Sequence, residues 1–160
     1  AMRRSELAAL RIEHLTRIED GLRVLIPRSK TDQEGEGRTI AVPRGLRICP
    51  LALLEAWLAA AGIRDGFVFR RMYRGDTVSE HPLSGEAVAL ILKQRATAVG
   101  LDATEFGAHS LRAGFLTSAA ATGASLFKMR DQSRHESLDV LAGYVRDVDL
   151  FKDHAGAGFL

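Results

Sequence analysis

Two short clusters in the second half of the chain carry residues suited to chemistry on a phosphodiester. His109 and Arg112 are three positions apart, and Tyr144 follows His135 by nine. Arginine presents a planar fork that holds phosphate oxygens through two parallel hydrogen bonds. Histidine can accept or donate a proton, and tyrosine can act as a nucleophile. This set predicts a site that binds one phosphodiester and attacks it with a phenol.

Two further cations belong to the same inventory. Arg3 lies in the stretch Arg3-Arg4-Ser5-Glu6-Leu7, and Lys30 lies in a polar segment between two expected strands. Taken singly, each has an ordinary explanation, since a surface arginine is usually solvated and a hairpin lysine aids solubility. Tyr144 has apolar neighbours and alone would be a core tyrosine. Only the combination indicates a function.

The elements of the second half must position these side chains. A helix is predicted from 109 to 122, ending at Gly123. On it His109 and Arg112 would project from neighbouring points of one face, close to the exposed N–H groups of the helix start. Shorter helices are expected at 125–131 and 137–145, followed by a polar tail from 146 to 160.

The first half predicts a small sheet flanked by helices. Alternating apolar residues favour strands at 22–26 and 38–42, joined by a long polar tip, and a third strand at 67–69. Helices are expected at 5–10, at 50–61, and from Ser84 to just before Gly100. The first of these has no evident cap, so we expect it and Arg3 to fray. The predicted fold class is α+β, mainly α, with a small three-stranded antiparallel sheet.

Composition bounds these expectations. The 160 residues suit one domain, 46% are hydrophobic, and the net charge of +2 permits a nucleic-acid partner without demanding one. Only four of the 22 basic residues are lysine, an arginine excess that a GC-rich genome also explains. Cys49 is the single cysteine, which excludes an internal disulfide, and the histidines lack metal-ligand spacing. We expect a cytoplasmic protein with no membrane span, metal or cofactor.

The pattern resembles the catalytic domain of the tyrosine recombinases, the phage integrase family. The family's first arginine lies in a Gly-Leu-Arg-x-Ser-Glu-Leu stretch, which residues 1–7 match with Ala1 in place of the glycine. The His-x-x-Arg box matches residues 109–112, and Ala113 stands where many members have a second histidine. In chain order, the six catalytic positions of the family fall on Arg3, Lys30, His109, Arg112, His135 and Tyr144.

The resemblance implies a reaction and its partners. The oxygen of Tyr144 would attack a DNA phosphate to form a 3′-phosphotyrosyl link, while Arg3 and Arg112 neutralise the charge that builds on the phosphate. Because a free tyrosine has a pKa near 10, neighbouring cations or a proton acceptor must activate it. The implied partners are double-stranded DNA and other recombinase subunits in a tetrameric synapse. Without DNA, we expect a monomer or a weak oligomer.

The remaining roles follow from the same resemblance. Lys30 would protonate the departing 5′-oxygen, His109 would take or share the tyrosine proton, and His135 would hydrogen-bond a phosphate oxygen. Glu6 would orient an arginine, unless it is a solvated surface residue. Neither ATP nor a metal is needed, and a prokaryotic, nucleoid-associated location is expected. The residues 1–160 would form the catalytic domain, without the N-terminal domain that clamps DNA in the family.

Two alternatives stay open. The chain could be a truncated, inactive DNA-binding remnant of a recombinase, a hypothesis motivated by the expected lack of the clamp domain and the modest net charge. It could also be a type IB topoisomerase-like enzyme, which uses the same chemistry to relax supercoils without exchanging strands between partners.

Overall fold

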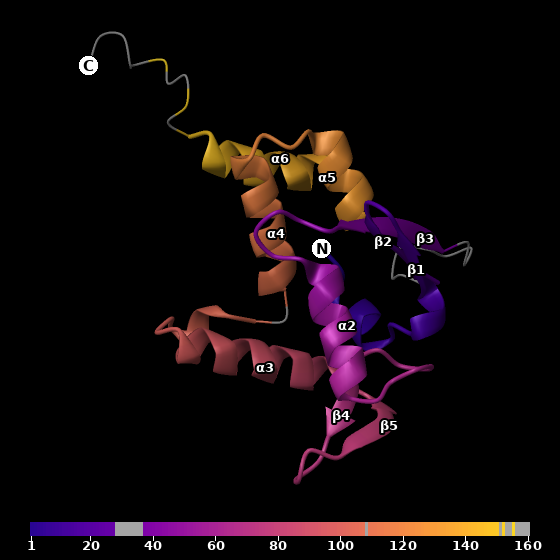
Figure 1. The fold of residues 1–160 in the computed structure, drawn as a ribbon. Coiled ribbons are helices and arrows are strands. Elements are labelled where there is room, and N and C mark those ends of the chain that lie inside the picture. The colour runs from indigo at the N-terminus through magenta and orange to yellow at the C-terminus, as the bar shows by residue number, and fades with distance from the viewer. Residues whose placement is uncertain (28–36, 108, 151, 153–154, 156–160) are drawn as a thin grey trace. The chain divides into compact units, whose positions relative to one another are not determined.

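A computed structural model of the chain describes residues 1–27, 37–107, 109–150, 152 and 155, and these form two compact units (Figure 1). The N-terminal unit comprises Arg3–Ala108, and the C-terminal unit comprises His109–Leu160 together with Ala1–Met2. Each unit has its own secondary structure and its own buried residues.

The N-terminal unit combines helices with short strands. Its described elements, in chain order, are α1 (Arg4–Ala8), η1 (Ile12–His14), β1 (Leu15–Ile18), β2 (Gly21–Ile26), β3 (Arg38–Pro43), α2 (Pro50–Ala60), β4 (Arg70–Met72), β5 (Val78–Pro82), α3 (Gly85–Ala98) and η2 (Ala103–Glu105). Strands β1, β2 and β3 form an antiparallel sheet in that order, and β4 pairs with β5 as a separate hairpin. With the helices of the C-terminal unit, this arrangement confirms the predicted α+β, mainly α fold class.

A tight turn fixes the register of the central sheet. Ile18 pairs with Gly21 across the turn at 19–20, and Gly21 also pairs with Pro43. Gly21 has φ +149, and a Cβ there would lie 2.3 Å from the carbonyl oxygen of Val42. Only glycine accepts this close approach without displacing β3.

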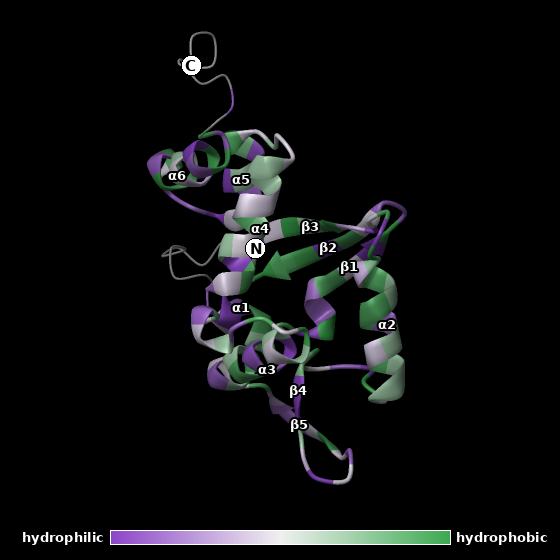
Figure 2. Ribbon diagram, turned by 90° about the vertical axis from the view of Figure 1, so that its left-hand side faces the viewer, coloured by the Kyte–Doolittle hydropathy of each residue, from purple (hydrophilic) through white to green (hydrophobic). Residues whose placement is uncertain are grey.

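The central strand β2 buries one face. Leu22, Val24 and Ile26 are buried, whereas Arg23 and Leu25 between them are exposed. The strand is coloured as hydrophobic along most of its length (Figure 2). Because strand side chains alternate, this pattern puts the apolar set on one side of the sheet, where each large side chain contributes about 1.5–3 kcal/mol when fully buried.

Helix α2 packs against β3, close to its predicted bounds. Pro50 is its first residue, and Leu51 and Leu58 are buried on it. The indole N–H of Trp57 donates to the carbonyl of Val68 over 2.8 Å, which ties the helix to the loop beyond it. The predicted cap of α3 is also confirmed, since the Ser84 hydroxyl accepts from the backbone N–H of Ala87.

The predicted third strand at 67–69 is wrong. In the structure, the third strand of the sheet is β1, which pairs with β2. Phe67 forms only an isolated bridge with Arg11, and Val68 donates its backbone N–H to the carbonyl of Leu10. Val68 is fully buried, but a loop and the Trp57 side chain satisfy its backbone groups instead of a strand ladder.

The start of α1 also differs from expectation. The helix begins at Arg4, and the carboxylate of Glu6 accepts the backbone N–H of Arg3 over 2.7 Å. This contact satisfies one of the donors that a helix start leaves open. The sequence hid the cap because its acceptor lies inside the helix and not before it.

The C-terminal unit is helical in its described residues. It contains α4 (Ser110–Ala121), α5 (Leu126–Ser133) and α6 (Leu138–Val148), which contact one another pairwise (Figure 1). The hydroxyls of Ser125 and Ser137 cap α5 and α6, as the predicted helix starts require. Helix α6 continues past the predicted end at 145, so the expected polar tail begins later. The core of the C-terminal unit consists of Leu116, Ala120, Met129 and Leu141.

None of the helices in the described ranges has the length and apolarity that crossing a membrane requires.

Candidate active site

Arg112 is a buried cation at the start of α4. Arg112 is only 7% exposed, and its Nη1 donates to the backbone carbonyl oxygen of Ala1 over 2.5 Å. A buried charge is costly unless it is paired or hydrogen-bonded, so a solubilising role does not account for its place. Arg112 is a fixed cation within the C-terminal unit.

His135 lies directly against this guanidinium. Nη2 of Arg112 is 3.3 Å from Nδ1 and 3.4 Å from Nε2 of the imidazole. An approach along the ring edge at these distances would drive Nη2 into the carbon between the two nitrogens. The guanidinium nitrogen therefore lies against the face of the ring, within hydrogen-bond distance of both ring nitrogens. The structure thus brings together two of the six predicted residues.

Ser133 is a third member of this group, and the sequence analysis missed it. Its side chain is fully buried, and Oγ lies 2.8 Å from Nδ1 of His135. Arg134, between them, ends α5 in the left-handed conformation with φ 58° and ψ 41°. That turn lets Ser133 and His135, two positions apart, face each other. The only sequence signal is a Ser-x-His spacing at a helix end.

Tyr144 lies on α6 with its ring against the core of the C-terminal unit. The residue is half-buried. Within the described residues its hydroxyl forms no hydrogen bond, and it is absent from the buried polar atoms that lack a partner. The ring of this half-buried residue is therefore anchored against the helical core.

His109 occupies the N-cap position of α4 and is exposed. Its backbone carbonyl accepts the N–H of Ala113 over 2.9 Å, but its ring makes no capping hydrogen bond. The prediction placed His109 and Arg112 on one face inside a helix. In the structure they share the helix start but differ in environment, because the N-cap residue stands just outside the helix.

Arg3 belongs to the N-terminal unit, where Glu6 holds it. Nη1 of Arg3 lies 2.8 Å from Oε1 of Glu6, and the Glu6 residue is 8% exposed. The hypothesis that Glu6 orients an arginine is therefore confirmed, and the alternative of a solvated glutamate is wrong. Lys30 lies outside the described residues. A common site for all six residues stays a prediction.

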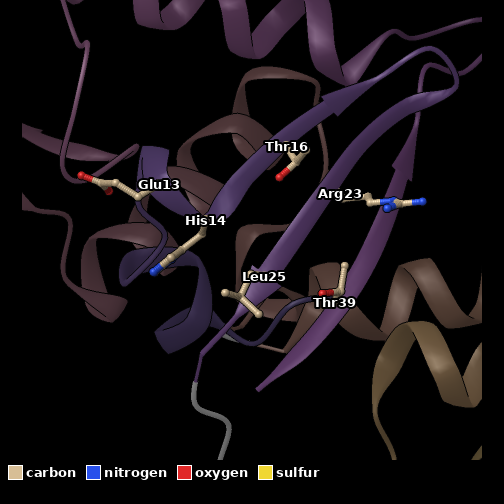
Figure 3. A pocket seen from close by; sticks show the side chains of 6 residues that line it. All are labelled: Glu13, His14, Thr16, Arg23, Leu25 and Thr39. Atoms are coloured by element: carbon tan, nitrogen blue, oxygen red, sulfur yellow. The ribbon is translucent and has the colours of Figure 1, made fainter. Parts of the chain in front are cut away.

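A hollow of about 570 Å³ lies elsewhere, on the outer face of the sheet (Figure 3). The Arg23 side chain points away from those of Glu13 and His14, so the lining groups do not converge. Hydrogen bonds from its own backbone N–H and from that of Gly66 lower the pKa of Glu13. This carboxylate is thus engaged in structure, and the hollow lacks a reactive cluster. The described residues also contain no group of three His, Cys, Asp or Glu side chains able to hold a metal ion.

Comparison with known proteins agrees with the fold and the motifs. Residues 1–149 match the model of the phage integrase family. The chain is 38% identical over 157 residues to an integrase/recombinase XerD homolog from Selenomonas ruminantium, an alignment that covers 97% of this chain and 46% of that protein. The chain therefore belongs to the phage integrase family, the tyrosine recombinases.

Solved structures of recombinases show the same fold. XerH bound to palindromic difH substrate, a post-cleavage complex, superposes with a TM-score of 0.73 and 20% identity, covering 98% of this chain and 42% of XerH. The pre-cleavage complex of XerH with difH gives 0.68 and 20%, with coverage of 94% and 41%. XerA gives 0.62 and 15%, with coverage of 89% and 46%. The chain spans less than half the length of each of these relatives.

Proposed function

We propose that this chain is the catalytic domain of a site-specific DNA recombinase and cleaves DNA through Tyr144. The observation that carries the proposal is the buried Arg112 in contact with His135, in the same unit as Tyr144, whose ring is anchored against the core of that unit. A fixed cation beside an imidazole suits a phosphate whose charge increases in the transition state.

In the proposed reaction the bonds balance without an external energy source. The oxygen of Tyr144 forms a bond to phosphorus as the bond from phosphorus to the 5′-oxygen breaks. His109 takes the phenolic proton, and Lys30 gives a proton to the leaving 5′-oxygen. One phosphodiester becomes a 3′-phosphotyrosyl ester, so the 5′-hydroxyl of another strand can reverse the step and rejoin the DNA.

The phosphate is bound by the arginines and by His135. Arg112 and Arg3 neutralise the non-bridging oxygens, and His135 donates a hydrogen bond to one of them. Glu6 keeps the Arg3 head group in one direction, which lowers the entropy lost when the phosphate binds. Both arginines are already held by protein contacts, and such preorganisation favours the transition state.

The partner proposed for the site is duplex DNA. The two XerH structures are complexes with difH substrate before and after cleavage, and this chain shares their fold. In the full-length protein, we expect residues 1–160 to work with an N-terminal clamp domain and with other subunits in a tetrameric synapse, at the nucleoid of a prokaryotic cell.

A suicide DNA substrate tests the assignment. Incubated with the full-length parent protein, a nicked duplex that loses a short 5′-hydroxyl fragment should trap a covalent complex, which migrates slowly on a denaturing gel. Tyr144→Phe should abolish the complex while changing the free energy of unfolding by less than about 0.5 kcal/mol, because the hydroxyl makes no hydrogen bond among the described residues. A complex that persists undiminished in Tyr144→Phe would refute the proposal.

The products separate this proposal from the topoisomerase alternative. A recombinase joins strands from two DNA sites and requires a defined sequence. If a single subunit relaxes supercoils on any sequence, and no strands are exchanged between DNA sites, the topoisomerase hypothesis is favoured.

A further inference from the structure

We propose that Arg11, Arg70 and the backbone of Gly66 form a binding site for a phosphate group in the N-terminal unit. The loop at 65–68 brings them together, because it bonds to the segment that follows α1. The reaction proposed above uses none of these residues. Such a site binds an anion without chemistry, so it does not depend on cleavage by Tyr144.

The loop holds both guanidinium groups in place. Nε of Arg70 donates to the carbonyl of Phe67 over 2.9 Å, and its Nη2 donates to the carbonyl of Asp65. The guanidinium of Arg11 lies over the Phe67 ring, with its central carbon 4.8 Å from the ring centroid. Because these contacts already restrict the two side chains, little further entropy is lost when an anion binds between them.

The two guanidinium groups converge on Gly66. This glycine has φ +70, and a Cβ built there would lie 3.3 Å from Nη2 of Arg70 and 3.9 Å from Nη2 of Arg11. Since both nitrogens approach one point, a single phosphate group can bridge them with hydrogen bonds of about 2.8 Å. A glycine at this position leaves space for the ligand that any other side chain would occupy.

Both side chains keep donors for a ligand. A guanidinium has five N–H groups, of which Arg11 uses one toward Glu13 and Arg70 uses the two described above. Within the part of the chain that the structure describes, Nη1 of both arginines and Nη2 of Arg11 have no hydrogen-bond partner. The Arg11 side chain is 41% exposed, so an anion can reach these donors.

Glu13 limits the affinity of the site. Its Oε2 lies 3.3 Å from Nε of Arg11, and its Oε1 accepts the N–H of Gly66 over 3.1 Å. The exposed residues Arg64 and Asp65, next to Gly66 in the chain, add opposite charges that offset each other. Two guanidinium groups against one carboxylate leave an excess of positive charge, which attracts phosphate, while the carboxylate keeps the affinity modest.

Titration of the full-length parent protein with inorganic phosphate, at an ionic strength held constant with sodium chloride, tests the site by ¹⁵N NMR. The amide of Gly66 and the Nε–H groups of Arg11 and Arg70 should shift together and saturate. Arg70→Gln should weaken phosphate binding about 10-fold, because it removes charge-assisted hydrogen bonds. The matched control is Arg71→Gln, an exposed arginine whose side chain points to the other face of β4, and it should bind phosphate as the native protein does.

A gain of affinity provides a test that does not depend on how the loop tolerates the loss of Arg70. Glu13→Gln keeps an oxygen for the Gly66 N–H but removes the negative charge, so it should bind phosphate about 3-fold more tightly. The inference is overturned if the native protein shows no saturable shift, or if Arg70→Gln and Arg71→Gln lose affinity equally. An affinity in Glu13→Gln that is no higher than in the native protein would also overturn it.

Duplex DNA identifies the source of the phosphate group. If the ligand is a phosphate of the DNA backbone, Arg70→Gln should reduce the slope of log affinity against log salt concentration by about 1, relative to Arg71→Gln. An equal slope in both variants, together with saturable binding of inorganic phosphate by the native protein, assigns the site to a free phosphate anion. If the native protein binds phosphate here but forms no covalent complex with the suicide substrate, the Tyr144 assignment fails and the phosphate site stands.

Discussion

Removing the Glu6 carboxylate should destabilise the N-terminal unit measurably, because this group makes two contacts with Arg3. Oε2 accepts the Arg3 backbone N–H over 2.7 Å, and Oε1 lies 2.8 Å from Nη1. Loss of a helix cap costs about 1 kcal/mol. The side chains of Arg3 and Glu6 are 19% and 4% exposed, so their ion pair should contribute more than a surface pair, about 1–2 kcal/mol. Glu6→Ala should therefore lower the free energy of unfolding by about 2–3 kcal/mol.

A second substitution separates the two contributions. Glu6→Gln keeps an oxygen that can accept the Arg3 backbone N–H but removes the charge, so its cost should be only about 1–2 kcal/mol. Salt should weaken the ion pair in the native protein more than any contact in Glu6→Gln.

Urea unfolding of both variants, followed by circular dichroism, measures these differences. The control is Glu105→Gln, an exposed glutamate in η2, which should unfold like the native protein. If Glu6→Ala unfolds at the same urea concentration as the native protein, Glu6 does not cap α1 in solution. The inference that Glu6 holds Arg3 is then refuted.

Three other outcomes follow from the structure. Arg112→Lys should slow covalent-complex formation about 10²–10³-fold in the suicide-substrate assay, because one ammonium cannot replace the two guanidinium nitrogens that contact the Ala1 carbonyl and the imidazole; a native rate would contradict the role of the Arg112 guanidinium. Leu141→Ala, at a fully buried position, should cost about 2–5 kcal/mol in urea unfolding, against little change for Val140→Ala on the exposed side of α6; equal effects would mean that the helical core is misassigned. Hydrogen bonds from the hydroxyl and backbone N–H of Thr104 lower the pKa of Asp102, so its stabilisation is present above its unfolded pKa and is lost as pH falls through its folded pKa. Asp102→Asn should therefore show a smaller loss of unfolding free energy between about pH 5 and pH 2 than the native protein, and an identical pH profile would contradict this.

Much of the local structure could be predicted because local chemistry specifies it. The serines at 84, 125 and 137 mark helix starts, since each hydroxyl accepts a backbone N–H two or three residues ahead. The strands at 22–26 and 38–42 follow from alternating apolar residues, and the covered face of β2 confirms that alternation. Gly123, with φ +76, stands just past the end of α4, as predicted.

The errors have a common cause in contacts between distant segments. β1 is a four-residue strand with weak alternation, and only pairing with β2 makes it a strand. Val68 has the composition of a strand residue, but its N–H is taken by Leu10 and its carbonyl by Trp57. No local propensity distinguishes these two outcomes.

The sequence by itself determined the family and the candidate residues, because side-chain type and spacing are read directly from the chain. The tertiary structure decided their environment: Arg112 is buried and contacts His135, Glu6 holds Arg3, and His109 stands exposed at a helix start. It alone revealed Ser133, because a hydroxyl contributes to a site only once the backbone turn at Arg134 brings it to hydrogen-bond distance of the ring. Burial and hydrogen-bond geometry depend on the folded path of the whole unit, and these quantities decide whether a residue is a solvated charge or part of a site.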